Sequence, residues 1–229
     1  MIISHKHKFI FIKTRKTAGT SLEIALSQFC GEEDIITPIS PKDELLRKEL
    51  GFRGPQNHSI TYKSLSPKAW KKLLQKRRRF ISFYNHISAK KIREQISDNS
   101  WNSYFKFCFE RNPWDKVVSH YYWQCQSDDR PPLSEFIKDQ ASKGKFSDFE
   151  LYSINNKIAV DKVYMYQDLN TAVQELTSLL YLDKPLLLPR AKSEFRTRKV
   201  HYSHLLNLDD KNMISQLFSR EIETFGFEF

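Results

Sequence analysis

Basic and hydroxyl-bearing side chains crowd into one short stretch near the start of the chain, residues 13–21, which read KTRKTAGTS. Such side chains offer hydrogen-bond donors to an anion, and the N–H groups and dipole of a following helix attract a phosphate-like group. The stretch lacks the first glycine of a P-loop and places Lys16 three residues before Gly19, so it is not a Walker motif. It predicts an anion-binding loop, with an ordinary basic turn as the alternative.

A second set of anion-binding side chains follows in residues 107–123, which read FCFERNPWDKVVSHYYW. Arg111 carries a planar fork of donors that suits a phosphate dianion, and Ser119 adds a hydroxyl two turns into the helix that Pro113 begins. Asn112 and Pro113 shape the turn between strand and helix. The alternative for Arg111 is an ion pair with Asp115.

Both sets follow short apolar runs that predict strands. Residues 9–12, FIFI, suit a strand that is buried on both faces of a parallel sheet, and the aromatic run at 104–109 predicts another strand. Residues 80–84 and 163–166 predict two more strands. In a parallel sheet, ligands gather at the carboxyl ends of the strands, where both sets of residues would lie.

Helical patterns alternate with these strands along the chain. The loop at 13–21 leads into a helix with Leu22, Ala25, Leu26 and Phe29 on one face. Ser88 and Asn170 are candidate N-caps. The sequence predicts further helices at 41–50, 68–77, 89–96, from Pro113 onward, at 133–140, 171–180 and 210–225. This alternation predicts a single three-layer α/β domain over residues 1–229, with a mainly parallel central sheet.

The composition favours a globular protein with anionic partners. The chain has 229 residues, 40% of them hydrophobic, and its 37 basic and 27 acidic residues give a net charge of +10. That charge predicts attraction to anions without choosing among them. No stretch is long and apolar enough to cross a bilayer and no leader sequence is evident, so we expect a cytoplasmic protein. The three cysteines have no metal-ligand spacing and receive no role.

Together, the loop residues 16–21 and the segment 107–123 resemble the sulfotransferase family that uses 3′-phosphoadenosine 5′-phosphosulfate (PAPS), and most of all its carbohydrate 2-O-sulfotransferase branch. The resemblance implies that the loop binds the 5′-phosphosulfate, through Arg15, Lys16, Thr17, Ala18, Gly19, Thr20 and Ser21. It also implies that Arg111 and Ser119 bind the 3′-phosphate. Lys16 would stabilise charge on the leaving group. Arg15 stands where many relatives have proline, and either a phosphate contact or a solvent-facing side chain fits that departure.

Sulfuryl transfer to a hydroxyl also needs a base for the acceptor proton. His86 lies in YNHIS, residues 84–88, which resembles the histidine-bearing segment of the 2-O-sulfotransferases, and this implies that His86 is the catalytic base. A histidine that caps the helix after Ser88 is the alternative for this position. His58, in an irregular loop, competes for the role of base. The spacing of His201 and His204 is compatible with a metal, but surface histidines explain it better, and the family needs no metal.

Two later segments resemble the family more weakly. Tyr166, at the end of the strand predicted at 163–166, is a candidate for cofactor contact, although Met165 and Gln167 depart from the family pattern. Residues 190–199 resemble the stretch from which the family often supplies a loop over the nucleotide. Its candidates are Lys192, Ser193, Arg196 and Arg198.

The leading hypothesis is therefore a sulfotransferase that moves a sulfuryl group from PAPS to the hydroxyl of a small molecule or glycan and releases adenosine 3′,5′-bisphosphate. Acceptor specificity would lie in residues 31–66 and 127–149. A basic module for single-stranded nucleic acid, using residues 71–79 and 190–199, is the alternative, although we expect no nucleic-acid partner. A nucleotide kinase is disfavoured because the Walker motif is missing. The sequence leaves the acceptor and the oligomeric state open.

Overall fold

Short apolar runs form the strands of the central sheet. The computed structural model describes residues 1–59, 82–127, 129–144, 146–189 and 200–229. Within these ranges the sheet has five strands in the order β3-β1-β2-β4-β7. The strands are β1 (Ile2–Ser4), β2 (Phe9–Phe11), β3 (Ile35–Ile36), β4 (Phe105–Glu110) and β7 (Lys162–Met165). A separate two-stranded ribbon joins β5 (Ser153–Ile154) to β6 (Lys157–Ile158).

The centre of the sheet is parallel and one edge is antiparallel. Strand β4 pairs in parallel with both β2 and β7, whereas β1 pairs antiparallel with β2 and β3. The expected α/β fold with a mainly parallel sheet is thus confirmed. The antiparallel edge was not predicted, because strands of three and two residues are too short to show a period.

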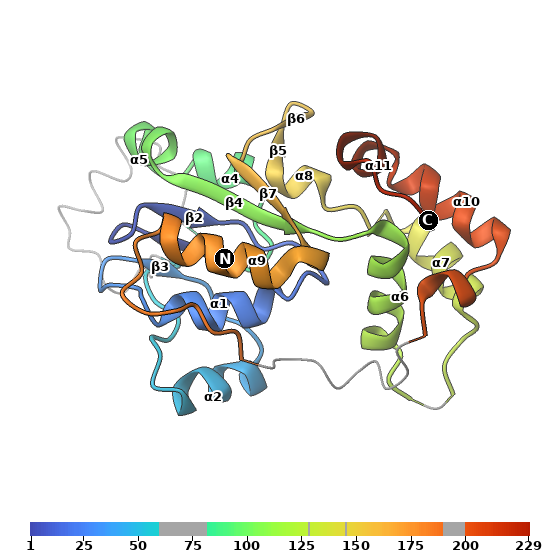
Figure 1. Cartoon of the computed structure of the whole chain (residues 1–229), viewed down its shortest axis with the longest axis horizontal. Helices are drawn as coiled ribbons and strands as arrows, with labels where there is room; N and C mark the ends of the chain where they lie inside the picture. The colour runs from blue at the N-terminus through green and yellow to red at the C-terminus, as the bar shows by residue number, and fades with distance from the viewer. Residues whose placement is uncertain (60–81, 128, 145, 190–199) are drawn as a thin grey trace, which may run out of the picture.

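Side chains alternate between two buried faces of the sheet, which explains why these strands are apolar at every position. Phe9, Phe11, Phe107 and Phe109 pack beneath α1 (Gly19–Ser27) and α9 (Leu169–Leu179). On the other face, Ile10 and other buried residues pack with α4 (Ala89–Arg93), α5 (Asp98–Ser103) and α8 (Phe149–Tyr152). The helices therefore form layers on both sides of the sheet (Figure 1).

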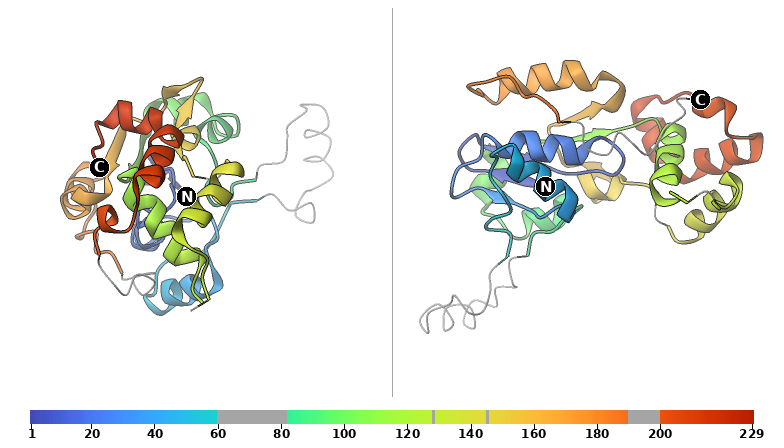
Figure 2. Two further views of the ribbon diagram at one scale, coloured as in Figure 1. Left: turned by 90° about the vertical axis from the view of Figure 1, so that its right-hand side faces the viewer. Right: turned by 90° about the horizontal axis from the view of Figure 1, so that it is seen from below.

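A group of helices continues the fold beyond the carboxyl end of β4. It contains α6 (Pro113–Gln124), α7 (Leu133–Ser142), the 3-10 turn η3 (Tyr202–His204), α10 (Leu208–Leu217) and α11 (Ser219–Phe225). These elements share a core around Trp114, Val117 and Ile214. Figure 2 shows the group beside the sheet, with α6 between the two parts. Strand β4 and helix α6 therefore hold the sequence ERNP at the junction.

Local signals placed most helix starts correctly. Helix α2 (Pro41–Glu49) begins with Ser40 as N-cap, and Ser88 caps α4 as predicted. The side chain of Asn112 caps α6 by accepting bonds from the backbone N–H groups of Trp114 and Asp115. Short polar N-caps satisfy donors that a helix leaves unpaired in its first turn.

Three expectations about elements are wrong. Asn170 does not cap α9, because the 3-10 turn η2 (Tyr166–Asp168) runs directly into that helix. The single last helix is two helices, broken at Phe218, and the first starts at a capping box on Asn207. The strand at 80–84 is absent over its described part, where Ser82 makes only an isolated bridge to Ser59. The helix predicted at 68–77 lies outside the described residues.

Candidate active site

The loop between β2 and α1 has an unusual backbone. Lys16 and Ala18 both adopt the left-handed conformation, with φ of 61° and 58°. Helix α1 begins directly afterwards at Gly19, with Ala18 as an N-cap whose methyl group cannot accept a hydrogen bond. The hydroxyl of Thr14 anchors the loop to the carbonyl oxygen of Phe109 on β4. The loop thus brings the positive end of a buried helix to the edge of the sheet, as an anion site requires.

The two lysines of the loop have different surroundings. Lys13 is buried, and its Nζ lies 2.7 Å from Oε2 of the buried Glu23 on α1. Lys16 is less buried and lines a pocket, and its Nζ lies 5.0 Å from the centroid of the Trp123 ring. Both lysines contribute to the lining of this pocket, but the ammonium group of Lys13 is held by the buried Glu23, whereas that of Lys16 lies near the Trp123 ring.

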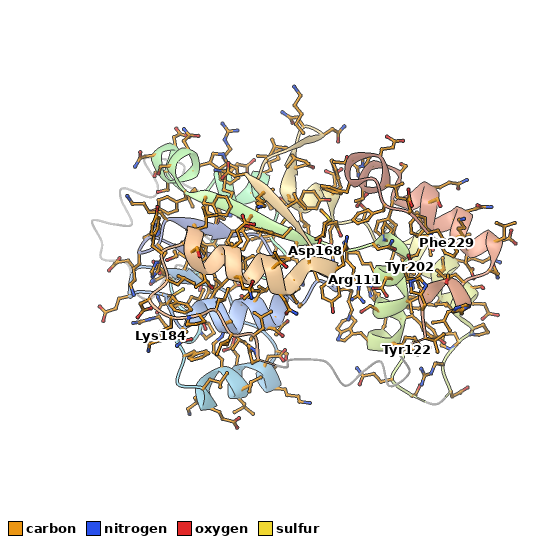
Figure 3. All side chains as sticks on the ribbon, in the orientation of Figure 1. Arg111, Tyr122, Asp168, Lys184, Tyr202 and Phe229 are labelled. Atoms are coloured by element: carbon orange, nitrogen blue, oxygen red, sulfur yellow. The ribbon has the colours of Figure 1, made fainter. Side chains whose placement is uncertain are left out.

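Arg111 lies at the junction between the sheet and the helical group, where Figure 3 labels it. Its Nη2 and Nε lie 2.7 and 2.8 Å from Oδ2 of Asp115, so the ion pair considered from the sequence is present. Its Nη1 also donates to the backbone carbonyl oxygen of Lys16 at 2.9 Å, and its guanidinium stacks 4.2 Å from the centroid of the Tyr166 ring. These bonds engage three of the five N–H groups of a guanidinium, so donors remain for an anion.

His86 adopts a left-handed backbone conformation with φ of 58°, and its Nδ1 lies 2.9 Å from the carbonyl oxygen of Lys13. A carbonyl oxygen only accepts, so Nδ1 carries the proton and Nε2 of the neutral ring keeps its lone pair. Burial lowers the pKa of His86 to about 4, and the neighbouring charge of Lys13 adds to the shift. The imidazole is therefore neutral near pH 7 and has the tautomer that a general base needs.

One pocket of about 410 Å³ collects these side chains. Its walls contain every predicted site residue that the structure describes: Arg15, Lys16, Thr17, Ala18, Gly19, Thr20, Ser21, His86, Arg111, Ser119 and Tyr166. His58 is not part of these walls, and Ser88, not His86, caps α4. Lys192, Ser193, Arg196 and Arg198 lie outside the described residues.

A second pocket of about 690 Å³ lies next to the first, because Arg111 and Tyr166 line both. Its other walls include Met165, Gln167 and Tyr202. The C-terminal segment forms one wall of it and is held there by the Asn112 side chain, which donates to the carbonyl oxygen of Glu228 at 2.8 Å. Figure 3 shows Tyr202 and Phe229 on the helical side of Arg111.

Sequence reasoning missed two residues of the first pocket on α6, His120 and Trp123. Burial lowers the pKa of His120 to about 4, helped by the charge of Lys16, and its Nε2 lies 3.1 Å from Oε1 of Gln124. Helical spacing contained the signal for Trp123, because this residue lies one turn after Ser119 and so shares its face of the helix.

His201 hydrogen-bonds Ser203, and the described residues contain no cluster of three or more metal-ligating side chains.

A chain of buried charges lies beneath the loop. Lys116 on α6 lies 2.6 Å from Oε1 of Glu110 and 2.9 Å from Oδ2 of Asp148. Asp148 also pairs with the guanidinium of Arg15, whose side chain remains 38% exposed. Burial would raise the pKa of Asp148, but the charges of Lys116 and Arg15 lower it below the usual value. Asp148 is therefore ionised, and its two cationic partners offset the cost of burying its charge.

A comparison with known protein families identifies the class of this protein. A sequence model of the sulfotransferase family matches residues 1–228, so the chain belongs to the sulfotransferase family and is an enzyme of the expected class. An uncharacterized protein of Archaeoglobus fulgidus is 32% identical over 100 residues, which cover 42% of this chain and 82% of that protein.

Mouse sulfotransferase SULT7A1, solved in complex with PAP, matches with a TM-score of 0.49 and 13% identity. The match covers 97% of this chain and 87% of the mouse chain.

Among the described helices, none has the length and apolar character to cross a membrane.

Proposed function

We propose that this sulfotransferase transfers the sulfuryl group of PAPS to an acceptor hydroxyl within the 410 Å³ pocket. The observation that supports this best is that Lys16, His86 and the pair Arg111 and Ser119 come from three separate segments of the chain yet line the same space. Two cationic side chains, a hydroxyl and a neutral imidazole are the groups that transfer between an anionic donor and an alcohol requires.

The roles follow from position. The N–H groups at the start of α1 and the cations of the loop hold the 5′-phosphosulfate. Arg111 and Ser119 hold the 3′-phosphate. The adjoining pocket, which shares Arg111 and Tyr166, takes the nucleoside. Lys192, Ser193 and Arg198 remain candidates for a further nucleotide contact.

His86 Nε2 removes the proton of the acceptor hydroxyl as its oxygen attacks the sulfur. The bond between sulfur and the bridging oxygen breaks, and Lys16 stabilises the negative charge that develops on that oxygen. Adenosine 3′,5′-bisphosphate leaves, and the proton stays on His86 until solvent removes it. Positioning and fixed positive charge supply most of the acceleration, as in phosphoryl transfer.

The acceptor is a carbohydrate or a small alcohol. Trp123 supports this choice, because it is 38% exposed and lines the same pocket as His86. A flat indole face provides an apolar surface for one side of a sugar ring. The alternative of a nucleic-acid module rests on residues 71–79 and 190–199, which lie outside the described ranges.

Ligand-dependent melting tests the proposal first. Adenosine 3′,5′-bisphosphate at millimolar concentration should raise the melting temperature, and adenosine 5′-monophosphate should raise it much less, since a ligand of the folded state stabilises by mass action. Transfer of labelled sulfate from PAPS to a panel of sugars and alcohols then identifies the acceptor. Equal shifts with the two nucleotides would overturn the assigned 3′-phosphate site.

A further inference from the structure

We propose that Asp148 is a positioning residue of this active site, which fixes both the guanidinium of Arg15 and the loop backbone at Lys16. The proposal rests on the sulfuryl transfer proposed above and adds a residue that contacts neither substrate. Asp148 belongs to the segment between α7 and α8, so its contact with the loop joins parts of the chain that are 133 positions apart.

Asp148 uses both carboxylate oxygens on this task. Oδ2 accepts a bond from the backbone N–H of Arg15 at 2.6 Å and lies 2.9 Å from Lys116 Nζ, while Oδ1 pairs with Arg15 Nη1. The side chain of Asp148 is fully buried, whereas that of Arg15 is 38% exposed and lines the pocket. A buried carboxylate thus holds a cation that is itself open to ligand.

The backbone contact matters because the next residue is strained. Lys16 and Ala18 occupy the left-handed region, which costs a residue other than glycine roughly 1–2 kcal/mol. Such a conformation persists only when neighbouring contacts hold it. Asp148 binds the N–H of Arg15 on one side of Lys16, and Arg111 binds the carbonyl oxygen of Lys16 on the other.

The charges explain why an acid is needed here. Arg15, Lys16 and Arg111 line one small pocket, and like charges that face each other spread apart until an anion binds. Asp148 offsets this repulsion for Arg15 from the protein interior, so its carboxylate takes up no space in the pocket. Lys116 would keep Glu110 as a partner if Asp148 lost its charge, so the interior would not be left with an unpaired cation.

Four variants test the proposal. Asp148→Asn keeps the size of the side chain but removes its charge, and Arg15→Gln removes the cation that it holds. The double variant places both changes in one protein. Glu150→Gln is the matched control, because Glu150 also pairs with an arginine, Arg220, but on the exposed face of α8. Initial rates at varied PAPS give kcat and KM, and hydrogen exchange of residues 15–18 reports the loop.

We expect Asp148→Asn and Arg15→Gln each to lower kcat about tenfold or more. Asp148→Asn should change KM for PAPS by less than about threefold, because positioning acts on the transition state, whereas Arg15→Gln removes a cation of the loop and should also raise KM for PAPS. The double variant should be no slower than the slower single variant, since Asp148 acts through Arg15 and its loop. Asp148→Asn should also speed exchange at residues 15–18, and Glu150→Gln should change neither property.

The failures are distinguishable. An active wild-type enzyme whose kcat survives Asp148→Asn, or additive losses in the double variant, would overturn the positioning role and leave sulfuryl transfer intact. A lower melting temperature with unchanged kcat would show a purely structural residue. A wild-type protein without bisphosphate binding or transfer would overturn the proposed function, and the inference with it. If Asp148→Asn does not fold, Arg15→Gln tests the proposal in its place. This variant should fold because Asp148 still pairs with Lys116, and an unchanged kcat in it would refute the proposal.

Discussion

Arg111 Nη1 donates a hydrogen bond to the backbone carbonyl oxygen of Lys16 across 2.9 Å. This bond joins the end of β4 to the loop after β2, which are neighbouring parallel strands. The residue proposed for the 3′-phosphate therefore also holds the residue proposed for the leaving group. Binding of the nucleotide and orientation of Lys16 depend on the same guanidinium.

Arg111→Ala should weaken binding of adenosine 3′,5′-bisphosphate by about 10- to 100-fold, because a charged hydrogen bond contributes about 1.5–3 kcal/mol. The preference for the bisphosphate over adenosine 5′-monophosphate should disappear. Calorimetric titration with both nucleotides measures this, and Arg220→Ala, which breaks an exposed ion pair, is the control. A variant that still discriminates between the nucleotides would contradict the assignment.

Lys16→Ala should reduce kcat more than it reduces affinity for the nucleotide. The loss expected for one group that stabilises a developing anion is about 10²- to 10³-fold in kcat. Steady-state rates and bisphosphate titration on the same preparation separate the two effects. Lys143→Ala, at an exposed pair with Asp139, should leave both values unchanged. A loss in affinity as large as the loss in kcat would make Lys16 a binding residue only.

The pH profile should reflect a base with a low pKa. Burial first, and then Lys13, lower the pKa of His86 to about 4, so the neutral ring is present at neutral pH and is lost as pH falls through that value. We expect kcat/KM to stay level from pH 7 to about pH 5 and to fall below it. His86→Gln should abolish this limb together with most activity, whereas His204→Gln, at an exposed position, should keep it. An unchanged profile in His86→Gln would exclude His86 as the base.

The same shift predicts how stability responds to acid. The unfolded chain takes up a proton on His86 near pH 6.5, but the folded protein resists it until about pH 4. Stability from this group is therefore complete above pH 6.5 and decreases as pH falls from 6.5 to 4. His120, whose pKa burial also lowers to about 4, acts in the same direction. Urea unfolding at pH 7 and pH 5 measures this effect. Between these pH values the free energy of unfolding should decrease less in His120→Gln than in the wild type. An equal decrease in the two proteins would count against the burial of the His120 ring.

The indole ring of Trp123 should contribute to kcat and to binding of the acceptor. Its ring lies 5.0 Å from Lys16 Nζ, and a cation–π contact at an exposed site contributes about 0.5–1 kcal/mol, equivalent to two- to fivefold. Trp123→Ala should lower kcat by about that factor and raise KM for the acceptor, while Trp123→Phe keeps a ring and most of the effect. Kinetics with varied acceptor check this, and equal behaviour of the two variants would exclude a role for the ring.

Local rules predicted the elements that carry the site. The apolar run at 9–12, the loop at 13–21 and the proline-led helix after Asn112 each contain a complete signal within a few residues. His86 lines the pocket although the strand predicted before it was wrong, and its role as the base stays a prediction. Phe83 is buried in the core as a strand residue would be, but its backbone N–H bonds only the carbonyl oxygen of His58.

The remaining parts depend on distant contacts. Strand β3 has two residues and forms because β1 offers an edge, so no period could reveal it. No local sequence signal distinguishes Asp148 from other acidic residues in loops, because its burial against Arg15 and Lys116 depends on the tertiary fold. Phe218, where the predicted last helix breaks, is 1% exposed and packs in the core of the helical group against residues distant in sequence.

Gly19 has no room for a side chain, because a Cβ atom there would lie 2.8 Å from Cγ of Lys13. The stem of Lys13 passes under the loop to reach Glu23, so the glycine serves the buried ion pair as well as the helix start. Across related sequences, positions 13 and 19 should therefore covary as one unit. A lineage that gains a larger residue at position 19 should also carry a shorter one at 13, while Glu23 keeps the N-terminal ammonium group as a partner.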